Sequence, residues 1–270
     1  MKKSIALSLI ALFTIGFVWL ASATSPTSAT QTGKPDKPVN VTKKPLIFEN
    51  VVNVNPGVYT LDHFLVYRVN PAQLNIEVRL RGQFDPDFLP ARLTGRDRFL
   101  NPVEKNGEPI LNRFAHLNWY RIQAPPEPVR TLSIFNQFGQ QVLVIGDPVA
   151  LLAPAEKVEP GSEFPKGLDH YKVYRVLDGE SVMWQVGLAD QFGQHGNLAG
   201  FPIYFAVPVE KVHNGQFFPI NNPKDHIVFY QLNPWPHNSA RPTIDQFGQH
   251  PVQTTHAVHL GVPTDKLAWQ

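Results

Sequence analysis

The stretch Leu168-Asp-His-Tyr-Lys-Val-Tyr-Arg-Val176, followed by Asp190-Gln-Phe-Gly193 and by Pro208-Val-Glu-Lys211, decides the fold of this 270-residue chain. Each of its three markers occurs four times, in one order and at a period of about 54 residues. The first marker is a His with a Tyr four residues later, at His63, His116, His170 and His226. The second is a Gln-Phe pair beginning at Gln83, Gln137, Gln191 and Gln246, and the third is a Pro-x-acid-Lys ending at Lys105, Lys157, Lys211 and Lys266. Three markers with one order and one period indicate a repeat protein of four units.

The third unit predicts three β-strands. Residues 168–176 and 181–188 are rich in β-branched and aromatic residues, and 203–212 is a similar run. Asp190 is expected to close an Asx-turn, and Gly193 accepts the positive φ angle on which such a turn ends. No convincing amphipathic helix is found, and 26 Pro and 18 Gly residues predict many turns. The chain is therefore expected to be all-β.

The joints between units predict how the units group. Lys105-Asn-Gly-Glu108 and Val212-His-Asn-Gly215 occupy matching places, whereas Glu159-Pro-Gly-Ser-Glu-Phe-Pro165 joins the second and third units. We therefore expect two β domains of two repeats each, residues 46–158 and 159–270, each a small β-barrel or sandwich without exposed strand edges. The alternative is a four-bladed propeller, against which three predicted strands per unit, rather than four, argue.

The N-terminal segment predicts export. Lys2 and Lys3, an apolar run over residues 5–20 and the small residues Ala21-Ser-Ala23 indicate a signal peptide, residues 1–23. The run is nearly long enough to span a bilayer, so an uncleaved anchor is the alternative. Residues 24–45 contain no aromatic residue and predict a disordered spacer. The expected location is the periplasm, the cell surface or the exterior.

Composition restricts the partners. The chain has no Cys, so an exported form has no disulfide and must be held by its core or by a ligand. Lys2 and Lys3 account for the excess of 24 basic over 22 acidic residues, which argues against nucleic acid as a partner. No membrane span is expected after signal cleavage, and no cofactor is expected. Envelope polysaccharide or protein remain as partner classes.

The markers resemble a family of exported bacterial proteins known only as a domain of unknown function. Its units run Asp-His-Phe/Tyr-x-Cys-Tyr, then Asp-Gln-Phe-Gly, then Leu-Cys-x-Pro-x-x-Lys-Asn-Gly. Asp62-His-Phe64, Asp169-His-Tyr171, Asp190-Gln-Phe-Gly193 and Pro102-Val-Glu-Lys-Asn-Gly107 match this pattern. The resemblance covers about residues 61–267 and implies a fold and an exported location, but no activity.

Other residues stand at the positions of that family's two cysteines. They form the pairs Val66/Leu100, Trp119/Leu152, Val173/Ala206 and Phe229/Gly261. If the family's cysteines are bonded, the resemblance implies that the members of each pair touch, because a disulfide requires a short Cα separation. A large residue opposite Gly in the fourth pair is what close packing favours.

The repeated His and Gln residues are the first candidate site. They offer four equivalent metal or ligand sites, or else each His packs on its strand and bonds a turn, such as the Asx-Gln turn of its own unit. The structural alternative is favoured, because zinc needs three or four ligands and each unit offers one or two. A denser group, His237, His250, His256 and His259, is a weaker metal candidate. His256 and His259 are three residues apart and would face opposite sides of a strand.

Two tryptophans are interpreted differently. Trp235 lies in Asn233-Pro-Trp-Pro-His237 and is a candidate ligand contact, since exposed aromatic residues on Pro-rich loops often mark interaction surfaces. Trp184 alternates with apolar residues and is expected in the core.

Signatures of catalysis are missing from the sequence. It contains no Gly-x-Ser-x-Gly, no His-Glu-x-x-His and no Gly-x-x-x-x-Gly-Lys-Ser/Thr. Asp62, Asp169 and Asp225 precede repeated histidines, but adjacent strand residues point to opposite faces. The favoured function is therefore an exported non-catalytic β-repeat module for binding or structure in the envelope or outside the cell. The alternative is an exported metal- or small-ligand-binding protein that uses the histidines, with or without hydrolase activity.

Overall fold

The computed structural model describes residues 50–51, 57 and 59–270, which form strands and turns without a helix. The predicted signal (1–23) and spacer (24–45) lie outside the described residues. Within the described residues the strands form one 15-stranded sheet, and the prediction of an all-β chain is confirmed. No helix there is long and apolar enough to cross a membrane.

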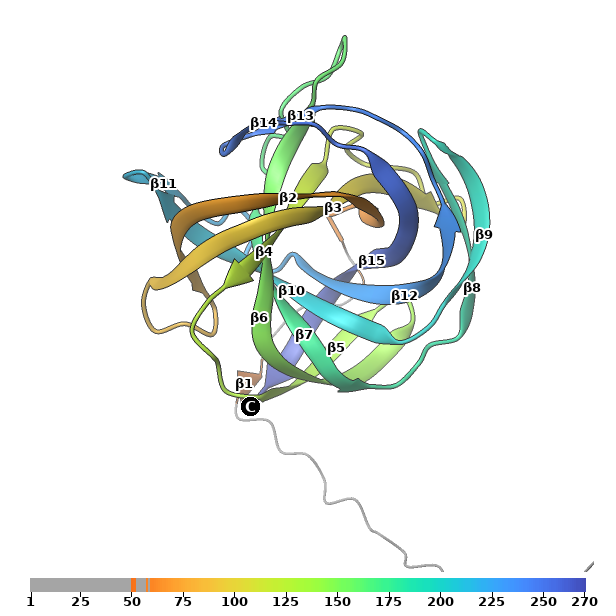
Figure 1. Ribbon diagram of the computed structural model, residues 1–270. Helices are drawn as coiled ribbons and strands as arrows, with labels where there is room; N and C mark the ends of the chain where they lie inside the picture. The colour runs from red at the N-terminus through yellow and green to blue at the C-terminus, as the bar shows by residue number, and fades with distance from the viewer. Residues whose placement is uncertain (1–49, 52–56, 58) are drawn as a thin grey trace, which may run out of the picture. The chain divides into compact units, whose positions relative to one another are not determined.

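Eight strands pair in an antiparallel ring (Figure 1). They are β2 (His63–Gly82), β3 (Leu89–Lys105), β4 (His116–Gln123), β6 (Gly139–Lys157), β7 (His170–Gly179), β10 (Pro202–His213), β12 (His226–Pro236) and β15 (Thr254–Trp269). Each pairs with the next, and β15 pairs back with β2. Each unit contributes two neighbouring strands, one beginning at the repeated His and one running through the marker Pro and Lys.

Between its two ring strands each unit leaves the ring as a hairpin. The remaining strands are β1 (Asn50–Val51), β5 (Arg130–Asn136), β8 (Trp184–Asp190), β9 (Gly193–Ala199), β11 (Gln216–Phe218), β13 (Thr243–Asp245) and β14 (Gly248–His250). The Asx-turns are confirmed, since Phe192 N donates to Asp190 Oδ1 at 2.8 Å and Phe138 and Phe247 repeat the bond. Gly193 has a φ of 136°. The sequence missed β9, which pairs with β8 although its residues have low strand propensity.

Each hairpin crosses to the unit two places away. β2 pairs with the end of β10, β5 with that of β15, β8 with that of β3 and β13 with that of β6. The described residues from Tyr59 to Gln270 accordingly belong to one compact unit. This differs from the predicted domains 46–158 and 159–270, because the hairpins connect unit one to three and two to four. The continuous pairing around the ring also differs from a propeller, in which each blade is a separate sheet.

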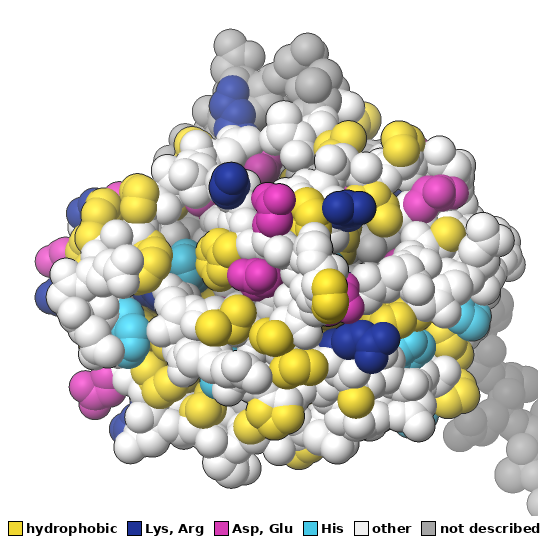
Figure 2. Space-filling view, turned by 90° about the horizontal axis from the view of Figure 1, so that it is seen from above, with side chains coloured by type: hydrophobic (Ala, Val, Ile, Leu, Met, Phe, Trp, Pro, Cys, Tyr) yellow, Lys and Arg dark blue, Asp and Glu magenta, His cyan; other side chains and the backbone are white. Residues whose placement is uncertain are grey.

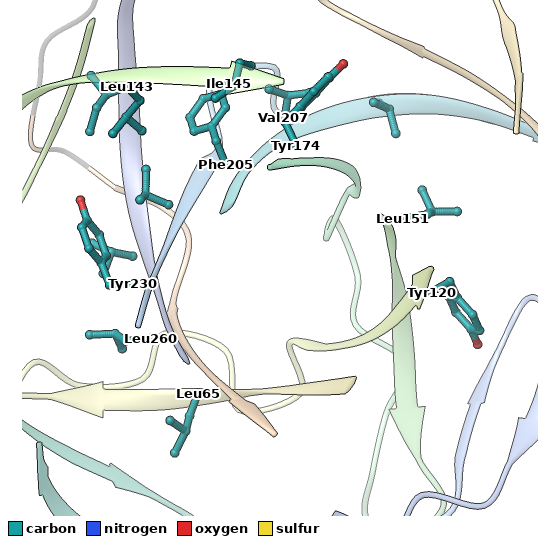
Figure 3. Close-up of a cluster of buried hydrophobic side chains, with 14 of the residues drawn as sticks. Leu65, Tyr120, Leu143, Ile145, Leu151, Tyr174, Phe205, Val207, Tyr230 and Leu260 are labelled. Atoms are coloured by element: carbon teal, nitrogen blue, oxygen red, sulfur yellow. The ribbon is translucent and has the colours of Figure 1, made fainter. Parts of the chain in front are cut away.

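Two hydrophobic layers follow from the alternation of side chains along the ring strands. Phe64, Val66, Leu117, Trp119 and Phe229 belong to a buried cluster to which all eight ring strands contribute, and which therefore fills the ring. The intervening residues belong to a second cluster that also contains hairpin residues such as Leu132 and Leu188. Tyr120, Tyr230 and Leu65 of this second cluster project away from the space that the ring encloses (Figure 3).

The four residue pairs that the resemblance relates to cysteine positions are all cross-strand partners. Val66 pairs with Leu100, Trp119 with Leu152, Val173 with Ala206 and Phe229 with Gly261. A Cβ atom added to Gly261 would lie 2.9 Å from Cε1 of Phe229, so the fourth pair is in contact. The expectation that each pair lies together is confirmed in register, and the pairs face the ring interior.

Candidate functional site

Three of the repeated histidines bond the Gln of the following unit. Nε2 of His63 donates to Oε1 of Gln137 at 2.9 Å. Nε2 of Gln246 donates to His170 at 2.6 Å, and Nε2 of Gln83 donates to His226 at 3.0 Å. The expected bond to a turn is present, but the turn belongs to the next unit and not to the same one. The bond between His226 and Gln83 joins the last unit to the first.

The repeated lysines follow the same order. Each is buried, and each ammonium lies over the Phe that follows the Gln of the next unit. The distances from Nζ to ring centroid are 5.6 Å for Lys105 and Phe138, 5.5 Å for Lys157 and Phe192, 4.9 Å for Lys211 and Phe247, and 5.1 Å for Lys266 and Phe84. Such contacts stabilise a cation that has been withdrawn from water.

The repeated tyrosines complete these junctions. The Phe of each Gln-Phe marker also packs edge-on against the repeated Tyr of the unit two places away. The ring centroids are 5.6 Å apart for Tyr67 and Phe192 and 4.9 Å apart for Tyr230 and Phe138. Tyr67 donates to Asp190 at 2.7 Å, and Tyr120 donates to Asp245. We call each group of His, Lys, Gln and Phe a junction. The four junctions hold consecutive units together around the ring.

Burial keeps the junction histidines neutral. Burial, together with the positive charge of the neighbouring Lys of the same unit, lowers the pKa of His63 to about 4 and that of His226 to about 3. Burial likewise lowers the pKa of Lys211 and of Lys266 to about 7. Both effects arise because a low-dielectric site disfavours the charged form.

The second junction departs from the others. The structure shows no hydrogen bond between His116 and Gln191; Nδ1 of His116 is buried without a partner in the described chain, and Gln191 is exposed. Lys157 instead donates to Oδ1 of Asn101 at 2.7 Å, and Asn101 donates to Asp190 at 2.9 Å. An asparagine therefore bridges the units at this junction.

The weaker metal candidates do not come together. Across the described residues no three His, Asp or Glu side chains form a group that could hold a metal ion. His237 bonds Thr254 at 2.6 Å, His250 lies 3.5 Å from Asp245, and His256 is exposed while His259 is buried. His256 pairs with Arg68 and His259 pairs with Val66, and these two partners lie on one face of β2. A β-bulge between Ala257 and His259 interrupts the alternation of β15, so the prediction that the two histidines face opposite sides is wrong.

Both tryptophans differ in location from their predictions. Trp235 lies in β12 and is partly buried against the second hydrophobic cluster. Its ring contacts that of His195 at a centroid distance of 4.9 Å. Its predicted loop is strand, because β12 continues through the prolines and pairs with β15. Trp184 is 54 % exposed instead of buried; it is the first residue of β8, and the buried residues of its face, Val186 and Leu188, follow further along the strand.

The aspartates beside the histidines hold loops. Asp62 accepts bonds from the backbone N of Leu111 and Asn112, and Asp169 accepts them from Asn221 and Asn222. The two loops are the matching joints after units one and three, so the pairwise likeness of these joints has a structural cause. Both carboxylates therefore already accept hydrogen bonds from backbone N–H groups.

The other end of the ring carries an arginine cluster that the sequence did not predict. Arg68, Arg98, Arg121 and Arg175 continue the inward-facing positions of β2, β3, β4 and β7, because they lie two residues beyond interior residues. We call this group the arginine end. The sequence signal is an Arg five residues after the His in the first three units, replaced by Gln231 in the fourth.

Aromatic side chains inside the ring pack against the arginine end. The Arg98 guanidinium carbon is 4.8 Å from the ring centroid of Trp119 and 5.6 Å from that of Tyr204. Trp119 itself contacts Tyr204 and Phe229 at 5.1 and 5.4 Å. Since β3 and β10 are not neighbours in the ring, the contact of Arg98 with Tyr204 shows that side chains converge across its interior.

The surface also contains hollows. A groove of about 610 Å³ is lined by Arg79, Arg92, Gln123, Pro125 and His213 among others. A second hollow of about 370 Å³ lies at the third junction and is lined by Phe164, His170, Phe218 and Gln246. On the face in Figure 2, hydrophobic, acidic, basic and His side chains are interspersed, without a broad area of one charge. This agrees with the balanced composition.

Comparisons with known proteins identify a family but no activity. No curated protein and no solved structure matches the chain. A family model described as a repeat of unknown function (DUF7450) matches residues 116–263, from the His of the second unit to the marker Pro of the fourth. The match spans more than half of the 270 residues, and the chain therefore belongs to this repeat family of unknown function.

Proposed function

We propose that the protein is an exported, non-catalytic β-repeat module that binds a partner in the cell envelope or outside the cell. The observation that carries this proposal is the burial of the repeated polar groups in junctions between units. Three of the four histidines are bonded to a neighbouring unit, and burial lowers the pKa of all four. Groups committed in this way stabilise a rigid scaffold, on which exposed surfaces are available for binding.

Two experiments test the proposal. Fractionation of cells that express the full chain should recover the protein outside the cytoplasm, because residues 1–23 have the features of an export signal. The purified protein should pellet saturably with isolated peptidoglycan or surface polysaccharide. Retention in the cytoplasm, or no pelleting with either polymer, would contradict the proposal.

The hollow at the third junction favours a second candidate function, the binding of a small molecule. Its apolar walls, Phe164 and Phe218, together with the exposed Lys166 in its lining, match the usual make-up of small-ligand sites. Phe164 is 46 % exposed and belongs to the joint that differs from the other two. A small aromatic compound that raises the Tm of the wild type but not of Phe164→Ala would support this candidate.

A further inference from the structure

We propose that the arginine end binds the oxyanion groups of an acidic polysaccharide. The inference rests on the proposed function, because it names the ligand class and the contact surface of the same binding module. The shared chemistry is a carboxylate, phosphate or sulfate group. Arginine matches all three, since its planar guanidinium donates paired hydrogen bonds to such oxygens.

Charge at the arginine end is unbalanced. Asp97 is the carboxylate that pairs with it, at 3.3 Å from Arg98 and 3.7 Å from Arg121. Within the described part of the chain, Arg68 and Arg175 form no ion pair, and both are exposed. Four guanidinium groups thus face one carboxylate, in a protein whose acids and bases otherwise nearly balance.

Hydrogen-bond donors at this end also exceed the acceptors. Nε of Arg98 is buried and has no hydrogen-bond partner among the described residues. Nε of Arg121 also lacks a hydrogen bond there, and its contact with Asp97 is an ion pair at 3.7 Å. A buried charged donor without an acceptor is costly, and an anionic ligand is one way to compensate for it. The ring holds these groups in place, because Arg68 and Arg98 are direct cross-strand partners and Arg175 pairs with Tyr204.

Apolar groups beside the arginines favour a sugar polymer as the carrier of the anion. Leu177 follows Arg175 by two residues and is 54 % exposed, and Phe201 precedes β10 and is 55 % exposed. Sugar rings present apolar C–H faces together with hydroxyl groups, so exposed apolar side chains next to cations suit acidic saccharides. The near balance of 24 basic and 22 acidic residues argues against the large basic surface that binds nucleic acid.

The test removes the two exposed arginines. Isothermal titration calorimetry of the purified full chain uses polygalacturonate, phosphomannan and heparin as carboxylate, phosphate and sulfate probes, with dextran as the uncharged reference. The variant Arg68→Gln/Arg175→Gln should bind the preferred acidic probe at least about tenfold more weakly, because two charge-assisted contacts are lost. Added salt should weaken the wild-type interaction.

The matched control removes two charges elsewhere. Arg79 and Arg92 line the groove and are exposed, so Arg79→Gln/Arg92→Gln changes the net charge equally. This control should bind within about twofold of the wild type, since surface substitutions remote from a site have small effects. Equal weakening by both double variants, equal binding of dextran, or no heat with any acidic probe would overturn the proposal.

Failure of this inference is distinguishable from failure of the proposed function. If the wild type and Arg68→Gln/Arg175→Gln pellet equally with envelope polymers, the module binds through another surface and the arginine end is excluded. If the wild type pellets with no polymer yet binds an acidic probe through the two arginines, the anion site stands and the envelope function fails. Thermal unfolding of both double variants should match that of the wild type, because neither exposed pair forms a buried contact.

Discussion

At the scale of the residue, the four copies of one marker share a sequence but differ in their contribution to the free energy of unfolding. Gln137 bonds a buried His of the preceding unit, whereas Gln191 is exposed and has no such bond. A buried ring nitrogen that loses its partner carries a desolvation penalty, while an exposed amide does not. Equivalent positions of the repeat are thus not equivalent in stability.

The two glutamines provide a matched pair of substitutions. Gln137→Ala should lower the free energy of unfolding by about 1–3 kcal/mol, because it leaves the His63 nitrogen without a partner. Gln191→Ala should change it by less than about 0.5 kcal/mol, as is usual for a surface substitution. Urea unfolding of both variants measures the difference, and equal losses would show that the junction bond is not the cause.

Glycine at position 261 is required by its neighbour. A Cβ atom there would lie 2.9 Å from Phe229 and 3.1 Å from Ile227, inside the ring. Gly261→Ala should therefore destabilise the protein by about 1–3 kcal/mol through overpacking. Gly196→Ala is the control, because no atom lies within 4 Å of its added Cβ. Thermal unfolding measures the Tm of both variants, and an equal decrease in the two would contradict the packing argument.

At the scale of the element, strand register brings together the residue pairs that the sequence resemblance relates to paired cysteines. Val173 and Ala206 are direct partners on β7 and β10, and both side chains are buried inside the ring. Cross-strand partners of this kind are close enough for a disulfide. The apolar contact and the covalent bond are thus alternative ways of joining the same two strands.

Cysteines introduced at that pair should form a disulfide. Val173→Cys/Ala206→Cys is expected to lose both free thiols on oxidation and to gain about 2–4 kcal/mol in the free energy of unfolding. The control is Val173→Cys/Val207→Cys, because Val207 pairs with Lys172 and points to the opposite face of β10. Thiol titration and urea unfolding report both effects. Two free thiols in the first variant would mean that the register is wrong.

The sequence predicted the strands that carry regular apolar residues, and missed those that depend on tertiary contacts. The ring strand at 203–212 and the turn at Asp190 have local signals, and both were found. β9 has no such signal, since it is held by its pairing with β8. The arginine end was missed for a related reason: Arg98 lies outside the repeated markers, and the closed ring alone brings it to Tyr204.

At the scale of the whole molecule, the crossing hairpins decide that the units form one body. Local likeness of the joints suggested pairs of units, and that likeness is real in the loops held by Asp62 and Asp169. It does not determine the grouping, because each hairpin pairs with a strand of the unit two places away. Long-range pairing of this kind leaves no local pattern in a single sequence. The period of the repeat, in contrast, is visible there as recurring markers.

The buried titratable groups of the junctions give the whole molecule an unusual pH dependence. The pKa of His63 is about 4 in the folded state against 6.5 in the unfolded chain, so stability falls as the pH falls below 6.5. The pKa of Lys211 and of Lys266 is about 7 against 10.5, so their contribution is lost as the pH falls from 10.5 to 7. Burial raises the pKa of Tyr67 and Tyr120 above 10.0, so stability falls again above pH 10.

The free energy of unfolding should therefore rise from pH 5 to a maximum near pH 10, whereas many proteins are most stable between about pH 5 and 8. Lys266→Met is the diagnostic variant, because the Lys266 ammonium has no hydrogen-bond partner in the described chain and lies over two aromatic rings. It should stabilise the protein at pH 7 and reduce the slope between pH 7 and 10, since one fewer proton is released on folding. Urea unfolding at pH 5, 7, 9 and 10 measures both quantities. A maximum near pH 7, or an unchanged slope in the variant, would mean that the junction lysines remain charged in the folded protein.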